Sequence, residues 1–140
     1  MVIVSCKKSE IIDPPPLTSP GVTAKISGAS IDYGVPTAEK QVSTDGTETI
    51  FISASTNDGN SIEVSLSKQG GIAAGSYSAS NAAFVGISNG TNYYATGTTV
   101  SIKIIAVDDT HVVGSFSGTA TDATSGAAKS ITEGRFYAVF

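Results

Sequence analysis

Apolar residues alternate with polar ones along much of the chain, and this period of two constrains the fold more than any other feature. The alternation is clear at 22–26, 50–54 and 62–66. Successive side chains of a β-strand point to opposite faces, so the pattern predicts strands with one buried face. The segment 57–60 reads Asn-Asp-Gly-Asn. It predicts a tight hairpin between the second and third strands, because Asp-Gly favours the positive φ of short turns.

The same signature recurs to the end of the chain. Further strands are predicted at 84–87, 93–95, 100–106, 111–121 and 131–140, with turns at Asn89-Gly90 and 108–110. About eight to ten short strands and no significant helix predict an all-β fold, an antiparallel β-sandwich or barrel, and leave the choice between the two open. Gly114, Phe116 and Gly118 share one strand face. This indicates close approach of a facing sheet, or an aromatic ring lying over a glycine.

Composition limits the possible function classes. The chain has 140 residues, which fits one domain, and its formal net charge is -4 with only 14% charged residues. The eight Lys and Arg residues are scattered and form no basic stripe for phosphates, so nucleic acid is not an expected partner. No run approaches the roughly 20 apolar residues of a membrane-spanning helix. The single cysteine excludes a disulfide within the chain.

The first twenty residues predict a membrane anchor and a spacer. Ile3, Val4, Ser5 and Cys6 resemble a lipobox, the motif that precedes a lipid-modified cysteine. The apolar run before it is shorter than a secretion signal requires, which indicates either a truncated start or a misassigned initiator. Four of the five prolines lie in 7–20, which favours an extended spacer. We therefore divide the chain into a signal remnant (1–6), a Pro-rich tether (7–20) and an all-β domain (21–140).

Several short motifs together resemble a known group of proteins. After Cys6 and the tether come Thr-Ala-Lys-Ile-Ser-Gly at 23–28, Gly-Ser-Phe-Ser-Gly-Thr at 114–119 and Ile-Thr-Glu-Gly-Arg-Phe at 131–136. This layout resembles short Bacteroidota-type lipoproteins that carry an all-β domain of unknown function. The resemblance implies a signal, a lipidated (palmitate-bearing) Cys6 and a place at the cell envelope, anchored in the outer membrane on its periplasmic or surface face. It implies no further site residue.

Two groups of side chains are candidates for a functional role. Tyr93 and Tyr94 follow Asn92, and exposed tyrosines are good surfaces for stacking against sugars or protein partners. Because adjacent strand residues face opposite ways, at most one of the two is expected in the core. His111 follows Asp108 and Asp109. One histidine cannot build a histidine-rich metal site, and Asp-Asp-Thr-His is what a hairpin turn favours, so we interpret it as a turn.

No catalytic constellation, metal site or cofactor site is predicted. Asp45, Asp58, Asn60 and Asp122 are possible calcium ligands, but they lack the spacing of a calcium-binding loop. The first hypothesis is therefore a non-enzymatic, lipid-anchored binding or structural module for a glycan or an envelope protein. The alternatives are a hydrolase or inhibitor whose site is built from scattered loop carboxylates, and a subunit of a surface assembly that pairs through an edge strand.

Overall fold

The strands predicted from the alternation form a single curled antiparallel sheet. The computed structural model describes residues 15–78, 81–96 and 99–140. The described residues contain eleven strands: β1 (Gly21–Ile26), β2 (Ala29–Gly34), β3 (Thr37–Val42), β4 (Thr47–Ser55), β5 (Ser61–Gln69), β6 (Gly75–Tyr77), β7 (Phe84–Ser88), β8 (Asn92–Thr96), β9 (Val100–Val107), β10 (His111–Thr121) and β11 (Ala128–Val139). None of the described residues forms an α-helix, and so this part of the chain contains no helix long and apolar enough to cross a membrane. The predicted all-β class is confirmed.

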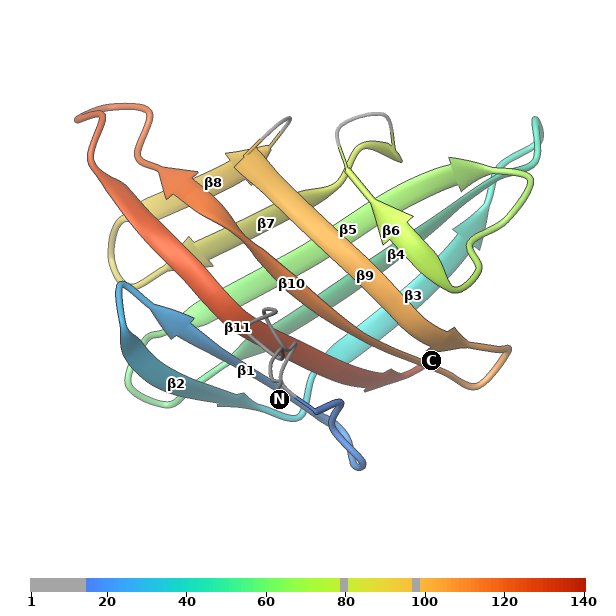
Figure 1. Cartoon of the computed structure of the whole chain (residues 1–140), viewed down its shortest axis with the longest axis horizontal. Coiled ribbons are helices and arrows are strands. Elements are labelled where there is room, and N and C mark those ends of the chain that lie inside the picture. The colour runs from blue at the N-terminus through green and yellow to red at the C-terminus, as the bar shows by residue number, and fades with distance from the viewer. Residues whose placement is uncertain (1–14, 79–80, 97–98) are drawn as a thin grey trace, which may run out of the picture.

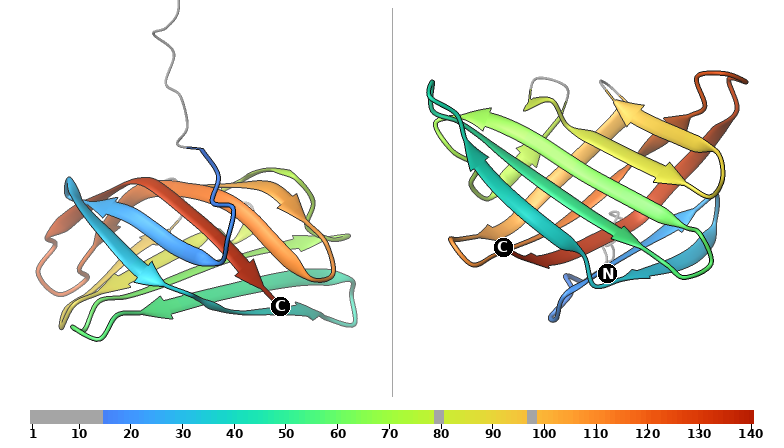
Figure 2. Two further views of the ribbon diagram at one scale, coloured as in Figure 1. Left: turned by 90° about the horizontal axis from the view of Figure 1, so that it is seen from below. Right: turned by 180° about the vertical axis from the view of Figure 1, so that it is seen from behind.

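The sheet folds into two layers that face each other across the core. The front layer of Figure 1 holds β2, β1, β11, β10, β9 and β6, and the back layer holds β8, β7, β5, β4 and β3. Figure 2 shows the two layers edge-on in its left view. They are joined where the end of β10 pairs with β8, at Thr121 and Tyr94. The fold is therefore one continuous sheet that curls into a sandwich.

The hairpins predicted from turn residues are present. β4 pairs with β5 from Thr47 to Ser55 without interruption, β7 pairs with β8, and β9 pairs with β10. A further hairpin joins β1 to β2 through Ser27 and Gly28, which both have positive φ, at 50° and 86°. Positive φ at both central positions is typical of the turn that matches the twist of paired strands.

Two phenylalanines and two glycines interlock between β10 and β11. Phe116 is paired with Gly134, and Gly114 is paired with Phe136. An added Cβ at Gly134 would lie 2.6 Å from the Phe116 ring, and one at Gly114 would lie 2.5 Å from the Phe136 ring. Each ring therefore occupies the space over the glycine of the facing strand. The second predicted explanation, an aromatic ring over a glycine, therefore holds at Gly114, whereas a Cβ at Gly118 would meet backbone atoms of Thr99 and Val100.

The two phenylalanine rings are part of an apolar core between the layers. Their centroids are 6.2 Å apart, and both side chains are buried. The core also takes in aliphatic side chains of both layers, among them Ile50, Ile52, Val64, Leu66, Val85, Ile102, Ile104, Val112 and Ile131. At about 25 cal/mol per Å² of apolar surface removed from water, such burial is the main stabilising contribution to a domain of this kind.

A lysine closes the sandwich on the side where the sheet is not continuous. Lys40 of β3 donates a hydrogen bond to the carbonyl oxygen of Asp108, in the β9–β10 turn, at 3.2 Å. Its ammonium group also lies 5.1 Å from the centroid of the Phe140 ring and 3.6 Å from the Asp109 carboxylate. Lys40 therefore connects an edge strand of the back layer to a turn of the front layer.

Candidate functional site

The outer face of the back layer carries a shallow groove of about 460 Å³. This face is turned toward the viewer in the right view of Figure 2. The pairing of the strands places most residues of the groove in two rows that run across the sheet. The central row crosses all five strands and consists of Thr37, Ser53, Glu63, Gly86 and Tyr94. The second row consists of Ser55, Ser61, Ser88 and Asn92. We call this site the outer groove.

Two aromatic rings form one end of the outer groove. Phe84 and Tyr94 lie on neighbouring strands, with ring centroids 5.6 Å apart and ring planes 32° apart. Gly86 is directly opposite Tyr94. A Cβ at Gly86 would come within 3.2 Å of the Phe84 ring and 3.3 Å of the Tyr94 ring, so both rings border the space over this glycine. The missing side chain at Gly86 allows two aromatic rings to lie side by side on the sheet surface.

Hydroxyl and amide groups line much of the rest of the outer groove, together with Glu63 and apolar residues such as Val35. Five serine and threonine side chains and Asn92 project from the two rows. Thr37 and Ser53 share a hydrogen bond of 3.1 Å between their hydroxyl groups. Each hydroxyl can donate one hydrogen bond and accept two, so this pair keeps further capacity toward a ligand. Glu63 is the only charged residue among the described residues that line the groove.

The two tyrosines predicted as a binding candidate lie on opposite faces of β8, as expected for adjacent strand residues. Tyr94 faces the outer groove and is 45% exposed. Tyr93 points the other way, packs against the core, and has the Lys129 ammonium 4.7 Å from its ring centroid. The structure thus places only Tyr94 in the groove, and Tyr93 lines a separate hollow of about 180 Å³ that also includes Tyr33. Burial raises the pKa of Tyr33 to about 12.

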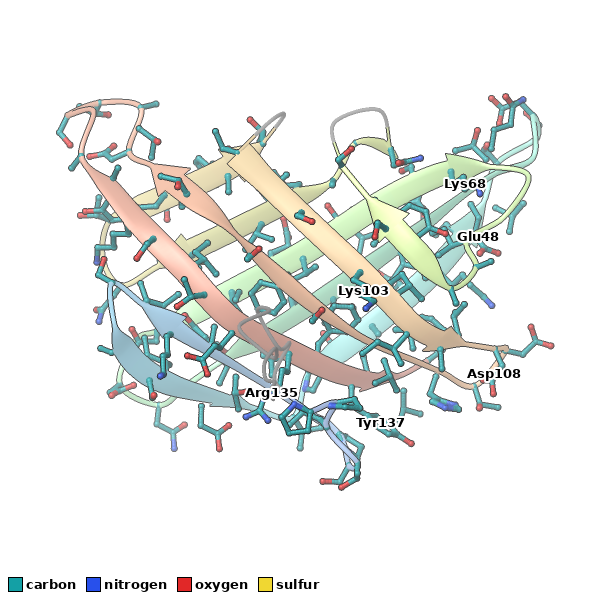
Figure 3. All side chains as sticks on the ribbon, viewed as in Figure 1. Glu48, Lys68, Lys103, Asp108, Arg135 and Tyr137 are labelled. Carbon is teal, nitrogen blue, oxygen red and sulfur yellow. The ribbon has the colours of Figure 1, made fainter. Side chains whose placement is uncertain are left out.

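The histidine and aspartates near 108–111 form a turn. The Asp108 carboxylate accepts hydrogen bonds from the backbone N–H and the hydroxyl of Thr110, both at 2.8 Å, and from the backbone N–H of His111 at 3.0 Å. These bonds lower the pKa of Asp108 to about 2, the Thr110 backbone N–H being the largest cause. The His111 ring stacks on Tyr137 with centroids 5.3 Å apart. Figure 3 shows Asp108 at the β9–β10 turn.

The possible calcium ligands lie in separate turns. Asp45 is in the β3–β4 turn, Asp58 and Asn60 are in the β4–β5 turn, and Asp122 follows β10. A hydroxyl hydrogen bond within each turn is the largest cause of a lowered pKa at all three aspartates. Among the described residues, no three His, Cys, Asp or Glu side chains are grouped so that they could hold a metal ion. Each of these aspartates therefore stabilises the turn in which it lies.

The end of the tether lies on the layer opposite the outer groove. Cys6 itself is outside the described residues. Arg135, on the outer side of β11, donates a hydrogen bond of 3.2 Å from Nη1 to the carbonyl oxygen of Pro15. Leu17 lies close to the start of β1, since a Cβ added at Gly21 would be 3.7 Å from Leu17 Cδ1. Residues 15–20 therefore run along the front layer, and the outer groove is on the other side of the sandwich (Figure 2, left).

Comparisons with known proteins add no relative. The chain matches no protein-family model, no curated protein and no solved structure at a significant level. Any role of the outer groove therefore has to be inferred from its own residues.

Sequence reasoning missed most of the outer groove. It singled out Tyr94 but assigned no binding role to Phe84, Gly86 or Glu63. One signal for Gly86 is present in the sequence, because a hairpin that turns at 89–91 pairs Gly86 with Tyr94. The position of Glu63 depends on the pairing of β5 with β7, which are not consecutive strands. No local sequence pattern predicts the pairing of β5 with β7.

Proposed function

We propose that this protein is a non-catalytic glycan-binding module of the cell envelope. The observation that carries the proposal is the outer groove, in which the Phe84 and Tyr94 rings adjoin rows of hydroxyl groups. The flat apolar face of a sugar ring stacks on an aromatic ring, while its hydroxyls exchange hydrogen bonds with polar side chains. A groove with one aromatic end and a hydroxyl-rich floor offers both kinds of contact.

The charge pattern supports binding without catalysis. Glycoside hydrolysis ordinarily needs two carboxyl groups on either side of the bond to be cut. Among the described residues of the outer groove there is one carboxylate, Glu63. The aspartates of the turns accept hydrogen bonds within those turns. The scattered carboxylates of the hydrolase alternative are therefore not gathered at the groove.

Anchoring through Cys6 is the second part of the proposal. A lipid at Cys6 would hold the chain at a membrane through the tether of residues 7–20. The tether reaches the domain on the front layer, where Arg135 binds the Pro15 carbonyl. The outer groove is on the back layer and so would face away from the tether, open to a polymer in the envelope. This arrangement favours glycan binding at a distance from the lipid.

Binding of glycans to the full chain tests the groove. We expect calorimetry with neutral linear hexasaccharides to detect binding, and Tyr94→Ala to weaken it about tenfold or more, which is ~1.4 kcal/mol. Tyr137→Ala is the matched control, because Tyr137 lies on the outer side of the front layer and stacks on His111. Gly86→Ala is a second perturbation: its Cβ would displace the rings by a few tenths of an ångström. Equal binding by wild type and Tyr94→Ala would contradict the proposal.

Lipid attachment has its own test. The chain is produced from its native gene in its own cells, as wild type and as Cys6→Ser. We expect the wild-type protein to carry lipid mass and to fractionate with membranes, and the variant to do neither. Identical unmodified masses would remove the anchor from the proposal and leave the groove to be judged by its own experiment.

A further inference from the structure

Strand alternation places two acidic residues and no basic residue on the outer face of the back layer. Among the described residues of β3, β4, β5, β7 and β8, the outward-facing charged side chains are Glu39 and Glu63. The lysines of these strands, Lys40 and Lys68, occupy inward-facing positions. Lys40 turns to the Asp108 carbonyl, and the Lys68 ammonium lies 5.9 Å from the centroid of the Tyr77 ring in the front layer. The face is therefore anionic, and Glu63 lies in the middle of the central row.

We infer that the outer groove selects linear uncharged oligosaccharides over acidic ones. This inference rests on the proposed function and names its ligand class. The Glu63 carboxylate accepts hydrogen bonds from sugar hydroxyls, and hydrogen bonds to a charged acceptor are stronger than neutral ones. The same charge repels uronic acids and phosphorylated sugars, and no described cation on this face offsets the repulsion. Rejection of like charge is a common source of binding specificity.

The shape of the groove favours a chain of sugars over a single ring. Its central row crosses five strands, from Thr37 on β3 to Tyr94 on β8. Neighbouring strands are ~4.8 Å apart, so the row spans about 19 Å. Glu63 is two strands from Tyr94, and a ligand stacked on Tyr94 therefore has to extend by more than one ring to cover both. Phe51, 39% exposed on the same face, lies beyond the groove toward Glu39, which is its cross-strand neighbour.

Matched hexasaccharide pairs test the inference. The probes are cellohexaose with the β-1,4-linked glucuronic acid hexamer, and β-1,4-mannohexaose with the β-1,4-linked mannuronic acid hexamer. Within each pair the linkage is the same and only the carboxylate differs. We expect wild-type protein to bind the neutral member of a pair about tenfold more tightly at low salt, and we expect this preference to shrink at ~1 M salt, where the screening length is ~3 Å. Glu63→Gln should reduce the preference to about twofold or less.

Glu39→Gln is the control, because it removes one charge from the same face outside the groove and should keep most of the preference. Equal or tighter binding of an acidic hexamer, or a preference that survives Glu63→Gln, overturns the inference. If Tyr94→Ala still abolishes binding in that case, the glycan site stands and only its charge selectivity is wrong. If no neutral hexasaccharide binds, or if Tyr94→Ala leaves every affinity unchanged, the proposed function fails together with the inference.

Discussion

Replacing Gly134 with alanine tests whether β10 and β11 are packed as described. The new Cβ would stand 2.6 Å from two ring carbons of Phe116 and 2.6 Å from the Phe116 carbonyl oxygen. The ring cannot simply rotate away, because it is buried against Phe136, and the carbonyl belongs to a paired strand. Overpacking of this kind costs ~1–3 kcal/mol, and the backbone clash places Gly134→Ala at the upper end, about 3 kcal/mol.

That cost converts into a measurable melting shift. Unfolding entropy is ~2.1 cal/mol/K per residue, so a domain of about 120 residues (21–140) loses about 12 °C in Tm for 3 kcal/mol. Thermal unfolding followed by circular dichroism measures the shift. Gly21→Ala is the control, since the nearest atom to its Cβ is 3.7 Å away, and it should leave Tm unchanged or slightly raised. A Gly134→Ala variant that melts within about 2 °C of wild type would refute the packing argument.

The remaining predictions concern the β9–β10 turn. Lys40→Met keeps the apolar stem near Phe140 but loses the hydrogen bond to the Asp108 carbonyl, so chemical denaturation should show a loss of about 1 kcal/mol. Asp109→Asn should change nothing measurable, because its carboxylate is fully exposed. Asp108 should titrate near pH 2 by NMR. Because this pKa is below the ordinary value of ~3.9, the contribution of the ionised Asp108 to stability is present above pH ~4 and is lost as pH falls toward 2. The Asp108→Asn variant should therefore lack that part of the loss of stability in acid.

Most strands were predictable because their signals are local. Alternation marks the inner face of β4 and β5, and Asp58-Gly59 supplies the turn between them. The prediction missed β2, β3 and the three-residue β6. β2 and β3 are edge strands, and most of their side chains are exposed, so apolar residues do not mark one of their faces. Edge strands of this kind carry polar residues that discourage further pairing, which hides them from a search based on alternation.

The sequence by itself determined the all-β class, the central hairpins and the opposite orientation of Tyr93 and Tyr94, since each follows from the two-residue period and from turn residues within a few positions. Only the tertiary structure decided that β5 pairs with β7, that β10 joins the two layers, and that Glu63 lies in one row with Gly86 and Tyr94. The physical reason is that pairing between non-consecutive strands is selected by how all the buried faces close over one core. The outer groove is a product of that closure.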